Sequence, residues 1–263
     1  MKRLLILALT LVSLPVLAQT DDFGLDFSVD AEKKICRGID FTLEGNARTQ
    51  DNTGSMERWA IGGSFGFKVL NTKTFDLKVN TGWEYIWQQK LEEREDKFKT
   101  DGSLKGYNVT ESYWRPRHRT TLGLSGTYAP NKRWSFSLKE FVQYNHYNAV
   151  DSIAKTKYRY NGANELVSTG DPEMKMKGAR DRFVLRSRFT AKYDIRRSHF
   201  APYASVDYGC GLNYTTSKWK FTAGTDYKLS KTNKLTAFYR FQHENDEDEP
   251  NGHIIGVGYS LKF

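Results

Sequence analysis

The sequence has few of the features that define small secreted domains or helical membrane proteins. Only two of its 263 residues are cysteine, which excludes a disulfide-rich framework. After the first eighteen residues, no apolar run is longer than about three residues, glycine aside. A helix that crosses a membrane needs about twenty consecutive apolar residues, so the exported chain is not a helical membrane protein.

The first eighteen residues differ in composition from the rest of the chain. Lys2 and Arg3 are followed by an apolar segment over Leu4–Val12 and then by small residues. This order is typical of a secretory signal peptide. We therefore expect residues 1–18 to be cleaved and residues 19–263 to form the exported protein. No cysteine follows the expected cleavage point, which argues against a lipoprotein anchor.

The exported chain instead shows a repeated alternation of apolar and polar residues, recurring in about eleven segments. Successive side chains of a strand point to opposite faces, so a wall with lipid outside and water inside must alternate in this way. The pattern predicts an all-β protein, a transmembrane antiparallel up-and-down β-barrel in the bacterial outer membrane. The last segment shows it most clearly, with these residues on one face: Ile255, Val257, Tyr259, Leu261 and Phe263.

A soluble β-sandwich or lipocalin-like barrel also alternates, and three features count against it. The segments are about 10–12 residues long, whereas strands of globular domains are usually about 5–6. The chain has fifteen Tyr, sixteen Phe and six Trp, enough for aromatic girdles at two membrane interfaces. The final strand ends on Phe263, an ending that the barrel assembly machinery of the outer membrane recognises. We expect that machinery and the outer-membrane lipids, including lipopolysaccharide, to be partners.

The expected connections alternate in length, as in bacterial barrels with short periplasmic turns and long outer loops. Short turns are expected at Lys33–Gly38, Leu70–Lys73, Pro130–Lys132, Arg196–His199 and Ser230–Thr232. Long polar connections are expected at Arg48–Glu57, Gln88–Glu111, Asn148–Ala179 and Glu244–Asn251. The third of these is long enough to carry a small exposed hairpin, with Lys155–Tyr160 as one arm.

The sequence does not fix the number of strands in the barrel. Counting back from a C-terminal strand that ends in the periplasm gives about eleven, whereas single-chain bacterial barrels have even numbers. Either Phe23–Ala31 lies in the lumen, leaving ten strands, or one strand is unrecognised and the barrel has twelve. We favour twelve. The same map places Cys36 and Cys210 at opposite rims, so we expect both to be free.

Several stretches resemble a family of bacterial outer-membrane proteins known as domain of unknown function 2490. They are Ser112–Arg119, Leu185–Arg188, Pro202–Val206 and, most clearly, Glu249–Tyr259. The resemblance covers essentially the whole exported chain. It implies an outer-membrane barrel and carries no activity with it.

The sequence offers no convincing catalytic site. Outer-membrane phospholipases and lipid A deacylases place His and Ser two residues apart, because an activated hydroxyl is the nucleophile. At His146 the corresponding position is Asn148, and at His253 it is Ile255. We therefore expect no enzyme activity and no cofactor. The acidic run Glu244–Glu249 lacks the central glycine of a calcium loop, so we interpret it as a solvated loop rather than a metal site.

The basic residues are the remaining candidates for binding. Arg115, Arg117 and Arg119 either contact lipopolysaccharide phosphates or face the lumen and pair with acidic residues, and the sequence does not decide between the two. Nucleic-acid binding is not expected, because the basic residues alternate along strands and form no single patch.

The lumen is expected to carry charges of both signs. The candidate lumen charges are Glu44, Glu84, Lys78, Lys139, Arg186, Arg188, Asp226 and Arg240. In a barrel of ten to twelve strands such charges either pair and fill the lumen or line a thin pore, and we favour filling. The sequence therefore predicts an integral outer-membrane barrel with a structural, surface or limited transport role. The alternative is a narrow, weakly anion-selective channel, and an outer-leaflet phospholipid or lipid A hydrolase is less favoured.

Overall fold

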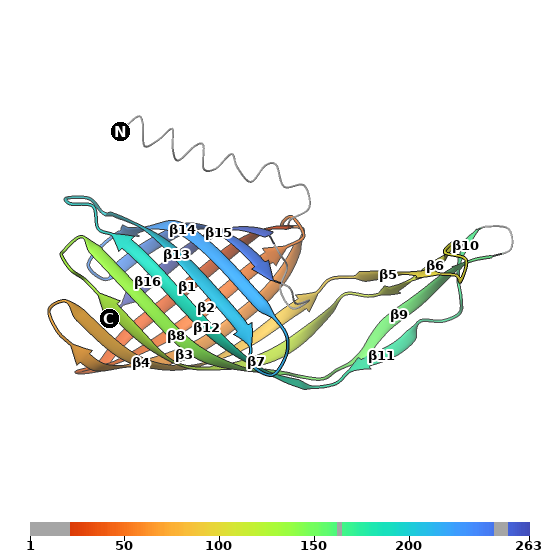
Figure 1. Cartoon of the computed structure of the whole chain (residues 1–263), viewed down its shortest axis with the longest axis horizontal. Helices are drawn as coiled ribbons and strands as arrows, with labels where there is room; N and C mark the ends of the chain where they lie inside the picture. The colour runs from red at the N-terminus through yellow and green to blue at the C-terminus, as the bar shows by residue number, and fades with distance from the viewer. Residues whose placement is uncertain (1–21, 162–164, 245–251) are drawn as a thin grey trace, which may run out of the picture.

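The computed structural model describes residues 22–161, 165–244 and 252–263. The expected signal peptide, residues 1–18, and most of the expected Glu244–Asn251 loop lie outside these residues. No helix within the described ranges is long and apolar enough to cross a membrane. The described chain is built from strands, which form one closed barrel and one external sheet (Figure 1).

Eleven strands of the described chain form the barrel, in the order β1-β16-β15-β14-β13-β12-β8-β7-β4-β3-β2. Their bounds are β1 (Asp22–Cys36), β2 (Ile39–Gln50), β3 (Ser55–Asn71), β4 (Phe75–Lys90), β7 (Tyr113–Tyr128), β8 (Trp134–Tyr147), β12 (Arg180–Tyr193), β13 (Phe200–Gly211), β14 (Ser217–Lys228), β15 (Asn233–Glu244) and β16 (Gly252–Lys262). All neighbours are antiparallel except β1 and β16, which are parallel. The predicted all-β antiparallel barrel is confirmed.

The parallel pair explains the odd strand count. β1 pairs with β16 from Asp22 opposite Gly252 to Glu32 opposite Lys262. With an odd number of alternating strands, the first and last run in the same direction, so closure must be parallel. The preference for twelve strands was therefore wrong, and so was the alternative that placed Phe23–Ala31 in the lumen. That segment is part of β1 and is hydrogen-bonded on both edges.

The exterior of the barrel is apolar and the lumen is polar. Large apolar side chains exposed on the outside include Phe27, Trp59, Ile61, Trp83, Leu122, Leu138, Phe189, Phe221 and Val257. Among the most buried side chains, by contrast, are Asp26, Arg48, Glu57, Arg117 and Gln242. Water-soluble proteins have the opposite arrangement, so the alternation along each strand produces a wall suited to lipid outside and water inside.

The two ends of the barrel differ. At one end, here called the proximal rim, short turns join the strands and β16 ends at Lys262. The opposite end, the distal rim, carries the long connections. The expected long loop at Arg48–Glu57 is shorter than predicted, because β2 continues to Gln50 and β3 begins at Ser55. Both cysteines are free, as predicted.

Four adjacent barrel strands continue past the distal rim as a separate sheet (Figure 1). This external sheet consists of β5 (Glu93–Phe98), β6 (Leu104–Thr110), β9 (Val150–Tyr160), β10 (Leu166–Ser168) and β11 (Glu173–Lys177). Along the chain, β5 follows β4 and β6 leads into β7. In the same way, β9 follows β8 and β11 leads into β12. The expected hairpin arm at Lys155–Tyr160 lies in β9. The sequence did not predict that the Gln88–Glu111 connection joins it in one sheet.

Candidate functional site: a basic lumen

The barrel encloses a cavity of about 530 Å³. Ten basic and four acidic side chains line it, which leaves an excess of positive charge. The basic residues are Arg48, Arg58, Arg117, Arg119, Lys139, Arg186, Arg188, Lys218, Lys220 and Arg240, and the acidic residues are Asp26, Asp30, Glu44 and Glu84. They converge because every second residue of each strand points to the same side of the wall.

The most buried ion-pair cluster surrounds Asp26. Arg48 Nη2 donates to Asp26 Oδ2 at 2.7 Å, and Arg240 Nη1 lies 3.3 Å from the same oxygen. Asn46 Nδ2 donates to the other carboxylate oxygen at 2.6 Å. Arg48 also lies near Glu57, at 3.6 Å between Nε and Oε2. The cluster therefore connects β1 with β2 and β15. Its contact between Asp26 and Arg240 spans β16, the strand that pairs in parallel with β1.

A second cluster lies between β12 and β13. Arg186 Nη2 and Arg188 Nε each lie 2.6 Å from Asp207 Oδ2. On the neighbouring strands β4 and β7, Arg119 Nη1 donates to Glu84 Oε2 at 3.0 Å. Two cations against one carboxylate leave the Asp207 cluster with net positive charge.

Lys139 lies on β8 between its register partners Ser125 on β7 and Arg188 on β12. Its side chain lines the cavity. Among the residues that the structure describes, Lys139 forms no ion pair or hydrogen bond, and its nearest strand neighbour of like charge is Arg188. An ammonium group beside another cation in a confined lumen is a candidate contact for an anion.

The distal mouth of the cavity contains a tyrosine surrounded by guanidinium groups. The Tyr147 ring lies 5.2 Å from Arg115, 5.0 Å from Arg117, 4.7 Å from Arg180 and 5.7 Å from Arg182. Arg117 Nη1 also donates to Tyr147 Oη at 2.7 Å. These contacts are within the range of cation–π interactions.

The structure places the predicted site residues as follows. Glu44, Glu84, Arg117, Arg119, Lys139, Arg186, Arg188 and Arg240 line the cavity. Arg115 is at the mouth and donates to the backbone carbonyls of Asn148 and Gly178. Lys78 and Asp226 lie near the proximal rim, where Lys78 pairs with Asp40 at 2.8 Å and Asp226 pairs with Lys192 and Lys234. The three arginines Arg115, Arg117 and Arg119 therefore occupy the lumen side of β7.

Sequence reasoning missed Asp207, Arg58, Lys218 and the role of Tyr147. The signal for Asp207 was present, because the alternation in β13 puts it on the same face as Ala201 and Tyr203. Tyr147 gave no such signal, since its importance depends on arginines from two other strands, β7 and β12.

A His–Asp pair lies on the outside of the barrel near the distal rim. His146 Nδ1 lies 2.7 Å from Asp181 Oδ1, and Tyr144 Oη donates to the same oxygen at 2.7 Å. Among the described residues, His146 has no hydroxyl nucleophile as a hydrogen-bond partner. The described chain also contains no group of three or more His, Cys, Asp or Glu placed to hold a metal ion.

Comparison with known proteins gives a family and shows a likeness to solved structures. A family model described as "Protein of unknown function (DUF2490)" matches residues 23–253. No curated protein matches the sequence. Among solved structures, the chain is similar to the β domain of the Bordetella autotransporter Brka, with 16% sequence identity and a TM-score of 0.43. The match covers 86% of this chain and 82% of that chain.

Proposed function

Because the chain belongs to the DUF2490 family, whose function is unknown, we propose a function from its structure. The chain is an integral outer-membrane β-barrel whose basic lumen admits small anions. The observation that carries this proposal is the lining of the cavity, in which ten basic side chains face four acidic ones.

The outer-membrane location is supported by the two surfaces of the wall. The exposed apolar side chains of the exterior need lipid around them, and the charged lumen needs water. The C-terminal strand supports assembly from the periplasm, because β16 ends at Lys262 and is followed by the exposed aromatic residue Phe263. We propose that this strand binds the barrel assembly machinery and that lipopolysaccharide surrounds the exterior near the distal rim.

Anion preference follows from the lumen charges. Rings of basic side chains attract anions and repel cations in a narrow pore. The cavity volume of about 530 Å³ is in the range of small-molecule sites. Ion pairs such as Arg119–Glu84 neutralise part of the lining, so the expected selectivity is modest.

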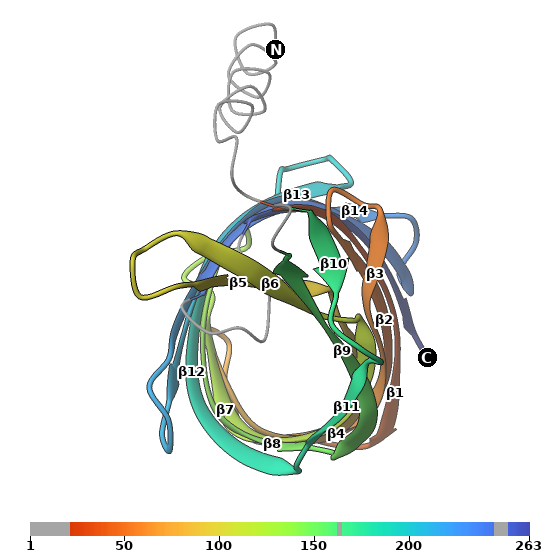
Figure 2. The same ribbon diagram turned by 90° about the vertical axis from the view of Figure 1, so that its right-hand side faces the viewer.

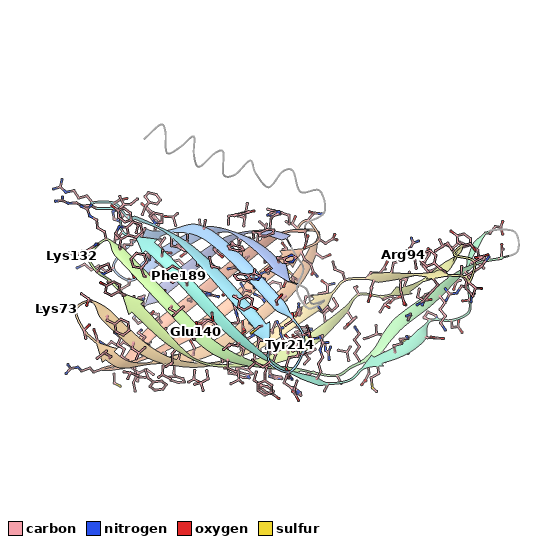
Figure 3. All side chains as sticks on the ribbon, in the orientation of Figure 1. Lys73, Arg94, Lys132, Glu140, Phe189 and Tyr214 are labelled. Atoms are coloured by element: carbon pink, nitrogen blue, oxygen red, sulfur yellow. The ribbon has the colours of Figure 1, made fainter. Side chains whose placement is uncertain are left out.

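The test is a planar-bilayer recording of the refolded barrel in a potassium chloride gradient. We expect a reversal potential on the anion-selective side. Lys139→Glu should move it toward zero or to the cation-selective side, because it reverses a charge inside the cavity. Lys132→Glu is the matched control, since Lys132 lies in the β7–β8 turn at the proximal rim (Figure 3). An absence of discrete conductance would contradict the transport role.

We also propose that the chain is not an enzyme. His146 pairs with Asp181 on the exterior, but the pair lacks the neighbouring hydroxyl that lipid hydrolysis by a serine nucleophile needs. Refolded protein incubated with phospholipid or lipid A and calcium should release no fatty acid. Release of fatty acid that is abolished by His146→Ala would overturn this proposal.

A further inference from the structure

The external sheet keeps the strand register of the barrel wall. Lys90 pairs with Tyr113 at the end of the barrel, and three residues farther along both strands Glu93 pairs with Thr110 in the external sheet. The register is also preserved on the other side: Arg180 pairs with Tyr147 in the barrel, and three residues farther along both strands Lys177 pairs with Val150 in the external sheet. Because side chains alternate along a strand, one face of the external sheet continues the lumen face of the barrel. We call it the inner face.

The inner face carries aromatic and apolar side chains beside one ion pair, in which Arg94 Nε lies 2.9 Å from Asp96 Oδ1. Tyr107 on β6 and Tyr158 on β9 lie beside each other, with ring centroids 5.0 Å apart. Arg94 on β5 covers the Tyr107 ring at 3.8 Å (Figure 3 shows Arg94 on this sheet). The strand register places Val109 and Met174 on the same face, and Met174 is 67% exposed. One extra residue in β9, where Ser152 has a φ of 63°, brings Tyr158 onto this face.

The opposite face of the external sheet, its outer face, is charged. Glu95 accepts hydrogen bonds from Lys97, Lys155 and Asn108. Lys157 pairs with Glu173 farther along. This face continues the lipid-facing exterior of the barrel, so its charges begin where lipid contact ends.

The polarity of the wall therefore inverts at the distal rim. Inside the barrel, charged side chains face the axis and apolar ones face outward, whereas in the external sheet the apolar side faces inward. Lipid cannot account for the inner face, because lipid surrounds the outside of the wall. Figure 2, viewed from the distal side, shows β5, β6, β9 and β11 crossing in front of the ring of barrel strands. An exposed apolar patch in this position is typical of a binding surface.

Between the inner face and the cavity lies the distal mouth, where Arg115 and Arg180 flank Tyr147. A molecule that moves along this wall toward the lumen meets an apolar surface first, then guanidinium groups, then the basic cavity. We propose that the inner face and the mouth bind a single-chain amphipathic anion. Its apolar chain lies against Tyr107, Tyr158 and Met174, and its carboxylate or phosphate head points toward the mouth. This inference rests on the proposed anion-admitting lumen and names a ligand class for it.

The test uses the full barrel in phosphatidylcholine nanodiscs and the fluorescent probe 11-(dansylamino)undecanoate, with empty nanodiscs subtracted. We expect saturable binding. Replacing both tyrosines, Tyr107→Ser with Tyr158→Ser, should weaken it by about tenfold or more. The matched control is Asn108→Ser with Lys157→Ser, which alters the outer face of the same two strands and should change binding by less than about twofold. Retained heat-modifiable migration in electrophoresis shows that each variant has folded.

Competition then tests the head group. Decanoate and decyl phosphate should displace the probe, whereas decanol and acetate should do so much more weakly. Displacement by decanol as strong as that by decanoate would overturn the anionic assignment, and equal weakening by both double variants would overturn the inner-face site. Anion-selective conductance without probe binding would refute only this inference. Probe binding without conductance would refute the proposed transport and leave the binding site.

Discussion

Leu25 on β1 lies opposite Ile255 on β16, and the two strands run in the same direction from the distal rim. This single parallel pair closes a wall whose other neighbours are all antiparallel. Gly252 lies at the start of the pair with a φ of 141°, and a Cβ there would lie 1.9 Å from the carbonyl oxygen of Asp22. Close approach of the two strands at this point requires glycine.

The closure can be tested by cross-linking. In a chain with Cys36 and Cys210 replaced by serine, Leu25→Cys with Ile255→Cys should form an intramolecular cross-link under mild oxidation or with a short bifunctional reagent. Leu25→Cys with Leu261→Cys should not, because six residues along a strand separate the thiols by roughly 20 Å. Electrophoretic mobility of the folded protein reports the link. Efficient cross-linking of the second pair alone would refute the register.

The Asp26 cluster should contribute strongly to stability. Asp26→Asn leaves Arg48 buried without its main carboxylate partner, and both side chains are at most 5% exposed. Breaking a buried pair in this way costs about 3 kcal/mol or more. Asp40→Asn is the matched control, because Lys78, its partner, is 29% exposed, and the expected loss is about 1 kcal/mol. Urea unfolding in phospholipid vesicles measures the free energy of unfolding of both variants. Equal losses would contradict the stronger contribution of the Asp26 cluster.

Glu140 should destabilise the barrel in a membrane. It lies midway along β8 on the lipid-facing exterior (Figure 3) and accepts a hydrogen bond from Ser187 Oγ at 2.5 Å. A carboxylate in contact with lipid is unfavourable. Glu140→Leu should therefore raise the free energy of unfolding in vesicles by about 1 kcal/mol.

The comparison variant for Glu140 is Glu84→Leu, which removes the lumen partner of Arg119. It should lower the same free energy, since it leaves a cation without its carboxylate. A loss of stability in Glu140→Leu as well would show that the exterior carboxylate makes a contact that the barrel needs.

The stability of the external sheet should depend on pH, because Glu95 is ionised only above its pKa. Hydrogen bonds from Lys97, then Lys155 and Asn108, lower the pKa of Glu95 from 4.5 to about 2. A carboxylate with a lowered pKa in the folded state stabilises that state above pH 4.5, and the contribution is lost as the pH falls toward 2. In Glu95→Gln the sheet should lose this dependence. Hydrogen exchange of β5 and β6 between pH 5 and pH 2 measures it, and identical profiles for both proteins would refute the role of Glu95.

The local pattern was enough to predict the faces of the wall. In β16, the alternation of Ile255 and Val257 with glycines predicts a strand with one apolar face, because period two is a property of consecutive residues. The same reasoning predicted that Lys139, Arg186 and Arg240 face the lumen. It also predicted the short turns at one end of the barrel, since turn residues are local signals.

Pairing between distant segments was decided only by the tertiary structure. The parallel closure joins β1 to β16, and Asp26 finds Arg240 at a separation of 214 residues. The external sheet joins two connections that the sequence treats as separate loops. Hydrogen bonds between strands and ion pairs inside the lumen depend on which segments become neighbours when the sheet curves and closes. Alternation along the chain therefore determined which side chains face lipid or water, and closure of the barrel determined which charges meet.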